Sequence, residues 1–184
     1  MNGLKKLFFI IKTDYNNNIN NRSLFKFLLY DFIYPNYRFR FLFWLRVCEF
    51  SRHNGFFSLI YPFAKFFWHK YKLKAQIEMP FYTTGPGCFF KHPCGTIIIN
   101  ARARIGCNCQ LSPGVIIGIS SIKRKDDCPI IGDNVYLSPN SQIYGKCNIG
   151  DNVIICPNTV IIDMDIPSNS FAYGNPVKVR SLLS

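Results

Sequence analysis

A six-residue period dominates the second half of this 184-residue sequence. From residue 97 onward, aliphatic residues recur at a spacing of six within two blocks, and nine of the ten are followed four positions later by a small residue; only Asp165 breaks this pattern. The aliphatic residues are Ile99, Ile105, Leu111, Ile117, Ile131, Leu137, Ile143, Ile149, Ile155 and Ile161. The small residues are Ala103, Cys109, Val115, Ser121, Val135, Ser141, Cys147, Val153 and Thr159.

This period excludes an isolated helix and a simple alternating strand. It is typical of a β-solenoid whose coil has three flat sides, in which each hexapeptide forms one side and one corner. We expect the aliphatic and the small residues to point into the prism. Gly132-Asp133-Asn134 and Gly150-Asp151-Asn152 have the composition of its corners. An ordinary β-sandwich with accidental spacing is the alternative.

The spacing is interrupted once, between Ile117 and Ile131, where the interval equals one repeat plus eight further positions. We therefore predict a loop over residues 119–130 that leaves the prism around Ser120 to Cys128. Such an excursion from a strict repeat is usually a functional element.

Residues 1–75 form a second region, basic and aromatic. They hold 13 Lys and Arg against three acids, a net charge of +10, whereas the rest of the chain has a net charge of only +2. We predict a loop at Asn16, Asn17, Asn18, Asn20 and Asn21, and two or three helices, one including Phe25–Tyr30 and the last over Phe56–Lys74. The alternation in Arg38-Phe39-Arg40-Phe41 leaves a strand there as an alternative.

The localised charge leaves several partners open. The chain has no nucleic-acid recognition motif, so we expect no nucleic acid. An anionic membrane surface, an anionic substrate and a solvated basic face remain as interpretations. A helix with this composition suits a peripheral position at a membrane interface, and the competing explanation is that its aromatic residues pack in the assembly.

The eight cysteines do not indicate a secreted disulfide scaffold, because the chain is too long for that class. The apolar run Leu7–Ile11 is too short for a signal peptide, and His53–Ala64 is too short to cross a bilayer. We expect a cytoplasmic protein with reduced, buried cysteines. No zinc site is expected, because Cys107 and Cys109 have no second ligand pair at finger spacing.

Several motifs point to one family. They are Gly85-Pro86-Gly87, the segment Lys91-His92-Pro93-Cys94-Gly95-Thr96 before the repeats, Val115-Ile116-Ile117-Gly118, Pro129 to Val135, and Tyr173-Gly174-Asn175-Pro176. Over residues 76–180 the chain resembles the hexapeptide-repeat acyltransferases, within them the serine acetyltransferase-like branch that includes capsule and O-antigen acetyltransferases. The resemblance implies a mainly β fold, a left-handed parallel β-helix over residues 76–166 with a C-terminal tail at 167–184. It also implies a homotrimer with acetyl-CoA between neighbouring prisms.

The resemblance also implies the site. Acetyl transfer to a hydroxyl needs a base and oxyanion donors, and imidazole suits the first role near neutral pH. His92 falls at the family's catalytic position. Glu78 lies near the place of the carboxylate that orients this histidine, one residue out of register. The positions that match cofactor-binding residues are Gly118, Pro139, Pro157 and Lys178.

Lys178 would pair with a CoA phosphate, or be an ordinary solvated lysine. No metal is expected. His53, in a turn, and His69, in an aromatic helix, are interpreted as structural or exposed.

Two departures from the family concern the acceptor. Serine acetyltransferases have an aspartate where this chain has Lys91, and an Arg-His pair where it has Asp127-Cys128. These inverted charges favour a sugar hydroxyl in surface polysaccharide synthesis over serine. Serine O-acetylation and a non-catalytic trimeric solenoid remain as alternatives.

Overall fold

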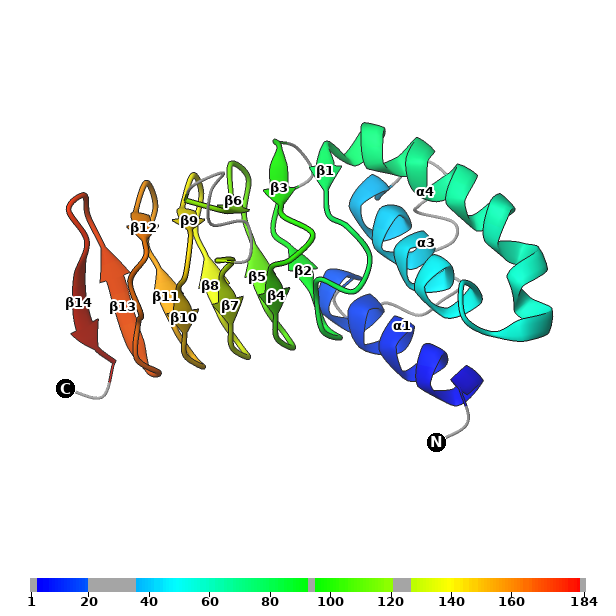
Figure 1. Ribbon diagram of the computed structural model, residues 1–184, viewed down its shortest axis with the longest axis horizontal. Helices are drawn as coiled ribbons and strands as arrows, with labels where there is room; N and C mark the ends of the chain where they lie inside the picture. The colour runs from blue at the N-terminus through cyan, green and yellow to red at the C-terminus, as the bar shows by residue number, and fades with distance from the viewer. Residues whose placement is uncertain (1–2, 20–35, 93–94, 121–126, 183–184) are drawn as a thin grey trace.

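The computed structural model describes residues 3–19, 36–92, 95–120 and 127–182. Helices form one end of the molecule and short strands follow them along its long axis (Figure 1). The helical end consists of α1 (Gly3–Ile19), α3 (Tyr37–Ser51), the 3-10 helix η1 (Gly55–Ile60) and α4 (Tyr61–Ala75).

The strands form three sheets that wind together as the sides of a coil. A five-stranded sheet has the order β1-β3-β6-β9-β12, a three-stranded sheet β10-β7-β4, and a six-stranded sheet β14-β13-β11-β8-β5-β2. The strands are β1 (Ile77–Glu78), β2 (Phe89–Phe90), β3 (Ile97–Ile99), β4 (Arg104–Ile105), β5 (Gln110–Leu111), β6 (Ile116–Gly118), β7 (Ile130–Ile131), β8 (Tyr136–Leu137), β9 (Gln142–Tyr144), β10 (Asn148–Ile149), β11 (Ile154–Ile155), β12 (Val160–Ile162), β13 (Ser170–Tyr173) and β14 (Lys178–Ser181).

The strand register gives the length of one coil. Ile98 pairs in parallel with Ile116, and Gln142 with Val160, an advance of three hexapeptides in both cases. Ile116 pairs with Gln142, and this longer advance means that the coil between them contains eight extra residues. The solenoid and its single insert are thereby confirmed, and the β-sandwich alternative is wrong. Of the predicted loop, residues 121–126 lie outside the described residues.

The interior of the prism is filled as the repeat predicts. All ten aliphatic repeat residues are buried, each 5% exposed or less. Eight of the nine small residues are buried as well, and the ninth, Ser121, lies outside the described residues. The predicted inward direction of both repeat positions is therefore confirmed.

The corners connect each coil to the next. Asn134 and Asn152 adopt positive φ angles of 57° and 54°, a conformation that asparagine tolerates better than most residues. The side-chain Nδ2 of Asn134 donates to Oδ1 of Asn152 at 3.2 Å. The backbone N–H of Asp133 donates to the Asp151 carboxylate at 2.7 Å. Corner residues thus hydrogen-bond one coil ahead and fix the stacking.

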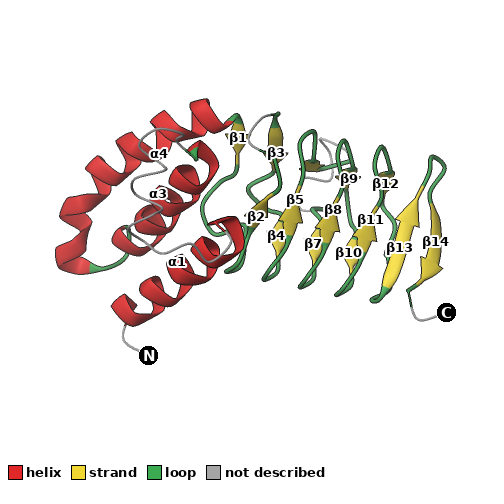
Figure 2. Ribbon diagram, turned by 180° about the vertical axis from the view of Figure 1, so that it is seen from behind, coloured by secondary structure: helices red, strands yellow, loops and turns green. Residues whose placement is uncertain are grey.

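At the helical end, α3 lies between α1 and α4 (Figure 2). Its residues Phe41, Leu42 and Leu45 are fully buried in a core that is continuous with the interior of the prism. Because Arg38–Phe41 belongs to α3, the strand alternative is wrong. The predicted helix over Phe56–Lys74 is observed as η1 followed by α4. Phe25–Tyr30 lies outside the described residues.

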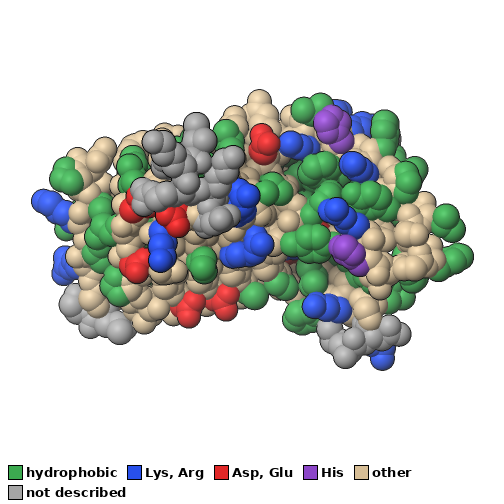
Figure 3. Space-filling model, viewed as in Figure 1, with side chains coloured by type: hydrophobic (Ala, Val, Ile, Leu, Met, Phe, Trp, Pro, Cys, Tyr) green, Lys and Arg blue, Asp and Glu red, His purple; other side chains and the backbone are tan. Residues whose placement is uncertain are grey.

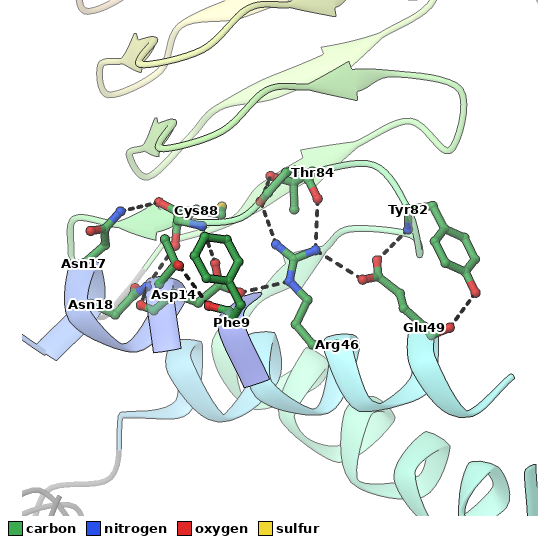
Figure 4. Close-up of polar contacts among 12 residues, drawn as sticks. Phe9, Asp14, Asn17, Asn18, Arg46, Glu49, Tyr82, Thr84 and Cys88 are labelled. Carbon is green, nitrogen blue, oxygen red and sulfur yellow. Dashed lines mark hydrogen bonds and ion pairs between the residues drawn. The ribbon is translucent and has the colours of Figure 1, made fainter. Parts of the chain in front are cut away.

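The loop predicted at Asn16–Asn18 is wrong, because these residues are part of α1. Asn17 and Asn18 donate through Nδ2 to the carbonyls of Gly87 and Cys88, each at 2.8 Å (Figure 4). These tertiary hydrogen bonds stabilise a helix that asparagine by itself disfavours. Asn20 and Asn21 lie outside the described residues.

A buried ion pair joins the helices to the first coil (Figure 4). Asp14 of α1 accepts from Nε of Arg46 at 2.9 Å and from the backbone N–H of Gly87 at 2.6 Å. Arg46 of α3 also donates to the carbonyls of Thr84 and Gly85, at 2.9 and 2.7 Å. One guanidinium therefore connects α1, α3 and the first coil.

The cysteines behave as core residues. The seven cysteines of the described chain are all free thiols, and five of them are buried. Burial raises the pKa of Cys88 to about 12 and that of Cys109 to about 11. Within the described residues, no helix has the length and apolar character needed to span a membrane.

Candidate active site

One edge of the prism is built from corners. Each coil contributes one corner, where the chain passes from the six-stranded to the five-stranded sheet. Because neighbouring coils are hydrogen-bonded in parallel, these corners stack on one another. His92 lies in the first corner, Pro139 in the third and Pro157 in the fourth. The described residues of these corners are 91–92 with 95–96, 112–115, 138–141 and 156–159.

Lys178 extends this edge by one more coil. Strand β13 continues the six-stranded sheet beyond β11, with Ile155 opposite Ala172. The antiparallel strand β14 returns along β13 and places Lys178 opposite Tyr173, at the end of β13 that faces the same edge. Five strand steps of about 4.8 Å separate β2 from β14, so the edge runs roughly 24 Å from the corner of His92 to Lys178.

The corner that carries His92 is held at both ends. On one side, Phe90 is buried against Phe41 of α3, with ring centroids 6.5 Å apart. On the other, the carbonyl of Gly95 accepts from the guanidinium of Arg38 at 2.5 Å. Gly95 has a φ of 95°, and a Cβ at this position would lie 2.6 Å from Pro113. His92 itself is exposed, so the fold presents its imidazole to solvent on a supported corner.

The residue before His92 is a lysine. Nζ of Lys91 donates to the hydroxyl of Tyr136 at 3.4 Å and lies 4.9 Å from the centroid of its ring. Burial acts to raise the pKa of Tyr136, but interactions with Ser112 and with the ammonium of Lys91 outweigh it and lower this pKa. The ammonium is thus held over Tyr136 of β8, two strands along the six-stranded sheet from β2.

Glu78 lies in β1, on the adjoining sheet. Its carboxylate is exposed and forms an ion pair with Lys72 of α4 at 3.7 Å. It lines a hollow of about 200 Å³ together with Thr96, the last residue of the His92 corner. No hydrogen bond or ion pair between described residues joins Glu78 to His92. The structure therefore places Glu78 near this corner without pairing the two side chains.

Gly118 is apart from the edge. It ends β6, so the width of the five-stranded sheet separates it from Pro113 in the preceding corner. A Cβ at Gly118 would lie 3.4 Å from the ring of Tyr144 on β9. Along one edge, the structure brings together His92, Pro139, Pro157 and Lys178. Gly118 lies at the opposite edge of the five-stranded sheet.

The other histidines lie at the helical end. His53 is exposed, with its ring centroid 5.9 Å from that of Tyr82, and His69 is exposed on α4. In the part of the chain that the structure describes, no three His, Cys, Asp or Glu side chains are grouped closely enough to hold a metal ion.

Two residues near the site were not identified from the sequence. Arg38 is buried in α3 and reaches the corner across 57 residues of sequence, a separation that no local pattern reveals. Tyr136 follows Lys91 by 45 residues. Its position was accessible in principle, because the coil length and the eight-residue insert align Phe89, Gln110 and Tyr136 on one sheet.

Comparison with known proteins agrees with this fold. Residues 128–163 match the family model described as bacterial transferase hexapeptide (six repeats). No curated protein matches the chain. Several serine acetyltransferases of known structure resemble it at low sequence identity.

The serine acetyltransferase of Neisseria gonorrhoeae superposes with a TM-score of 0.73 at 21% identity, over 96% of this chain and 66% of that one. The enzyme of Brucella abortus strain S19 gives a TM-score of 0.68 at 17% identity, over 96% and 70%. Isoform 3 of Entamoeba histolytica, in complex with cysteine, gives 0.70 at 20% identity, over 93% and 59%.

The present chain thus spans about two thirds of the Neisseria enzyme. At these identities the likeness establishes the fold, a mainly parallel hexapeptide-repeat solenoid preceded by helices. The family match agrees with the expectation of a transferase.

Proposed function

We propose that this chain is an acetyl-CoA-dependent O-acetyltransferase, built as a left-handed parallel β-helix and active as a homotrimer. The observation that carries the proposal is the single edge of the prism along which His92, Pro139, Pro157 and Lys178 lie. An exposed imidazole at one end and an ammonium at the other suit a long substrate with a reactive thioester and terminal phosphates.

In this proposal His92 acts as general base. Its imidazole takes the proton of the acceptor hydroxyl as the hydroxyl oxygen attacks the thioester carbonyl. The new C–O bond forms, the C–S bond breaks, and the imidazolium returns its proton to the departing thiolate. Lys178 pairs with a phosphate of the donor, and Pro139 and Pro157 line its path. Glu78 lies near the His92 corner but pairs with Lys72, and Gly118 lies across the five-stranded sheet from the edge, so both retain only secondary roles.

L-serine is the first acceptor to consider. The fold neighbours are serine acetyltransferases, and this favours the serine alternative over the sugar acceptor that the inverted charges indicate. A zwitterionic amino acid would place its ammonium in the field of the residues next to His92. A serine-specific site must therefore hold that ammonium away from Lys91.

A sugar hydroxyl is the second candidate, and Lys91 favours it. Lys91 precedes His92 in the chain, and its ammonium contacts Tyr136. Two like charges repel at short range, so this position disfavours an acceptor ammonium and suits a neutral or anionic glycan. The same ammonium replaces the aspartate that the resemblance to serine acetyltransferases leads one to expect.

The test is acetyl transfer from labelled acetyl-CoA to L-serine and to a panel of neutral and anionic sugars. We expect His92→Ala to lower turnover about a hundredfold or more, the scale of a positioned base. His69→Ala is the matched control, because His69 is also an exposed imidazole, on α4. Near-normal turnover of the His92 variant would remove it from this role. A chain that neither binds nor uses acetyl-CoA would be a non-catalytic solenoid.

Assembly and location complete the proposal. If the donor lies between neighbouring prisms, light scattering should report a trimer, and a fully active monomer would contradict the shared site. We place the protein in the cytoplasm, which the free thiols of the described cysteines support. We divide it into a helical region over 1–75, a catalytic β-helix over 76–166 and a tail over 167–184. This tail includes β13 and β14.

A further inference from the structure

An exposed apolar ridge runs along η1 and α4. Its members are Phe56, Leu59, Phe63, Phe66 and Leu73, whose exposed fractions are 82%, 76%, 58%, 65% and 65%. A folded protein seldom leaves so many large apolar side chains exposed on one continuous segment unless they contact a partner. We call this set the η1–α4 ridge.

Within α4, Phe66 and Leu73 of the ridge lie on the side that faces away from the core. Ala64, Tyr71 and Ala75 are buried toward the core. With 3.6 residues per turn, Phe66 and Leu73 fall on the opposite side of the helix. Phe63 also packs edge-on against Trp44 of α3, with ring centroids 5.8 Å apart, whereas Phe66 and Leu73 face away from the core, so a partner can cover them without unfolding α4.

The segment is basic as well as apolar. η1 and α4 together contain four lysines, at 65, 70, 72 and 74, and no Asp or Glu. Nζ of Lys74 lies 4.9 Å from the ring centroid of Tyr37, and Nζ of Lys70 lies 5.8 Å from that of Phe67. Such lysines keep their stems on apolar surface and their ammonium groups at its border.

Basic and apolar side chains share the surface of the helical end, whereas the acidic ones visible in the same view lie over the strands (Figure 3). The lysines beside the ridge are therefore opposite in charge to the acidic side chains on the solenoid face.

We propose that the η1–α4 ridge docks on the surface of an anionic lipid bilayer. Aromatic and aliphatic side chains enter the boundary between headgroups and acyl chains, and lysines beside them pair with lipid phosphates. A second copy docking through the same ridge is disfavoured, because it would bring the four lysines of one η1–α4 segment against those of another. The attachment is peripheral, since the ridge lies along a helix of 15 residues.

This docking would orient the solenoid. The first coil joins the helical end through Arg46, and the coil with β13 and β14 is the most distant from it (Figure 1). Docking would thus bring the corner of His92 closer to the bilayer than Lys178. This consequence rests on the proposed function, whereas the docking itself does not.

The experiment is co-sedimentation of the full chain with vesicles of phosphatidylcholine, with and without phosphatidylserine. We expect binding to the anionic vesicles at low salt, and affinity at least about tenfold weaker for neutral vesicles and at high salt. Leu59→Ser with Phe66→Ser, and separately Lys70→Glu with Lys74→Glu, should each weaken binding about tenfold or more. Circular dichroism checks that each variant keeps its helices.

Matched controls lie on the solenoid. Ile162→Ser removes a side chain that is 55% exposed on β12, and Lys146→Glu reverses a charge in the turn before β10. Both variants should bind like the unaltered chain. Absence of co-sedimentation with anionic vesicles at low salt would overturn the proposal, as would undiminished binding by both ridge variants. If vesicles do not bind and light scattering shows the ridge variants to be smaller assemblies, the occupant is a second copy.

Acetyl transfer is measured separately on the same preparations without lipid. A chain that transfers acetyl groups but ignores vesicles refutes only the docking, and a chain that binds vesicles but lacks transferase activity refutes only the proposed function.

Discussion

The buried ion pair between Asp14 and Arg46 permits a quantitative test of how the helical end is attached. The two side chains are 2% and 3% exposed, and the contact is 2.9 Å. In Asp14→Ala, Arg46 keeps the partly exposed Glu49 at 3.1 Å but loses its buried partner. Removing one member of a buried pair costs about 3–5 kcal/mol, because the remaining charge is poorly compensated.

The hydrogen bonds of Asp14 lead to a similar loss in the free energy of unfolding. The Asp14 carboxylate accepts from Arg46 at 2.9 Å and from the N–H of Gly87 at 2.6 Å. Hydrogen bonds to charged groups contribute about 1.5–3 kcal/mol each. We therefore expect Asp14→Ala to lower the free energy of unfolding by about 3–5 kcal/mol. With an m value of about 2 kcal/mol/M, the urea midpoint would fall by about 2 M.

The assay is urea unfolding followed by circular dichroism at the helix signal. Glu78→Ala is the matched control, because its pair with Lys72 is exposed and should contribute no more than about 1 kcal/mol. Asp14→Leu with Arg46→Met should be less destabilised than Asp14→Ala, since no buried charge is left alone. A change of less than about 1 kcal/mol in Asp14→Ala would refute the buried-pair reasoning.

Three further predictions concern the edge and the thiols. Lys178→Ala should raise the KM for acetyl-CoA about tenfold with kcat little changed, whereas Arg180→Ala on the same strand should not; steady-state kinetics decides, and equal effects would argue against a phosphate contact. Tyr136→Phe should leave the free energy of unfolding within about 1 kcal/mol because its contact with Lys91 is exposed, yet raise the acceptor KM severalfold; an unchanged acceptor KM would place Lys91 outside the acceptor site. At pH 8 roughly one Cys88 thiol in ten thousand is ionised, given its pKa of about 12. Iodoacetamide should therefore alkylate the half-buried Cys156 first and Cys88 only in denaturant, and mass spectrometry detects the modified residues. Equal rates for Cys88 with and without denaturant would contradict its burial.

The solenoid was predictable because each hexapeptide carries its own structural information. Ile143 and Ser141 point inward because neighbouring repeats place the same residue types at the same depth. The insert was visible for the same reason, as a break in the spacing after Ile117, and the strand register recovers its eight residues. Short-range periodicity was sufficient here, because each coil contacts chiefly its neighbours.

The helical end was less predictable because long-range contacts determine it. Asn17 and Asn18 carry a local preference for loops, and only their hydrogen bonds to Gly87 and Cys88, 70 residues away, stabilise the helix. The pair of Asp14 with Arg46 spans 32 residues and obeys no period. Neither contact is predicted by a repeat or by helical spacing.

In the candidate site, too, the positions set by the repeat were predictable and the long-range contacts were not. The positions of Pro139 and Pro157, which lie one coil apart, follow from the coil length once the repeat is known. The contact of Arg38 with Gly95 does not, because it joins a helix to a corner through a side chain that sequence patterns leave undistinguished.

The way the ladder of strands begins and ends bears on its solubility. A stack of parallel coils exposes unpaired backbone groups at both ends and can in principle grow by adding another molecule, as in a fibril. Here α3 buries Phe41, Leu42 and Leu45 against the first coil. At the other end, β14 reverses direction and carries Lys178 and Arg180, whose charges oppose further strand addition. Replacing those two cations with valine would leave an uncharged β-edge and favour end-to-end polymerisation.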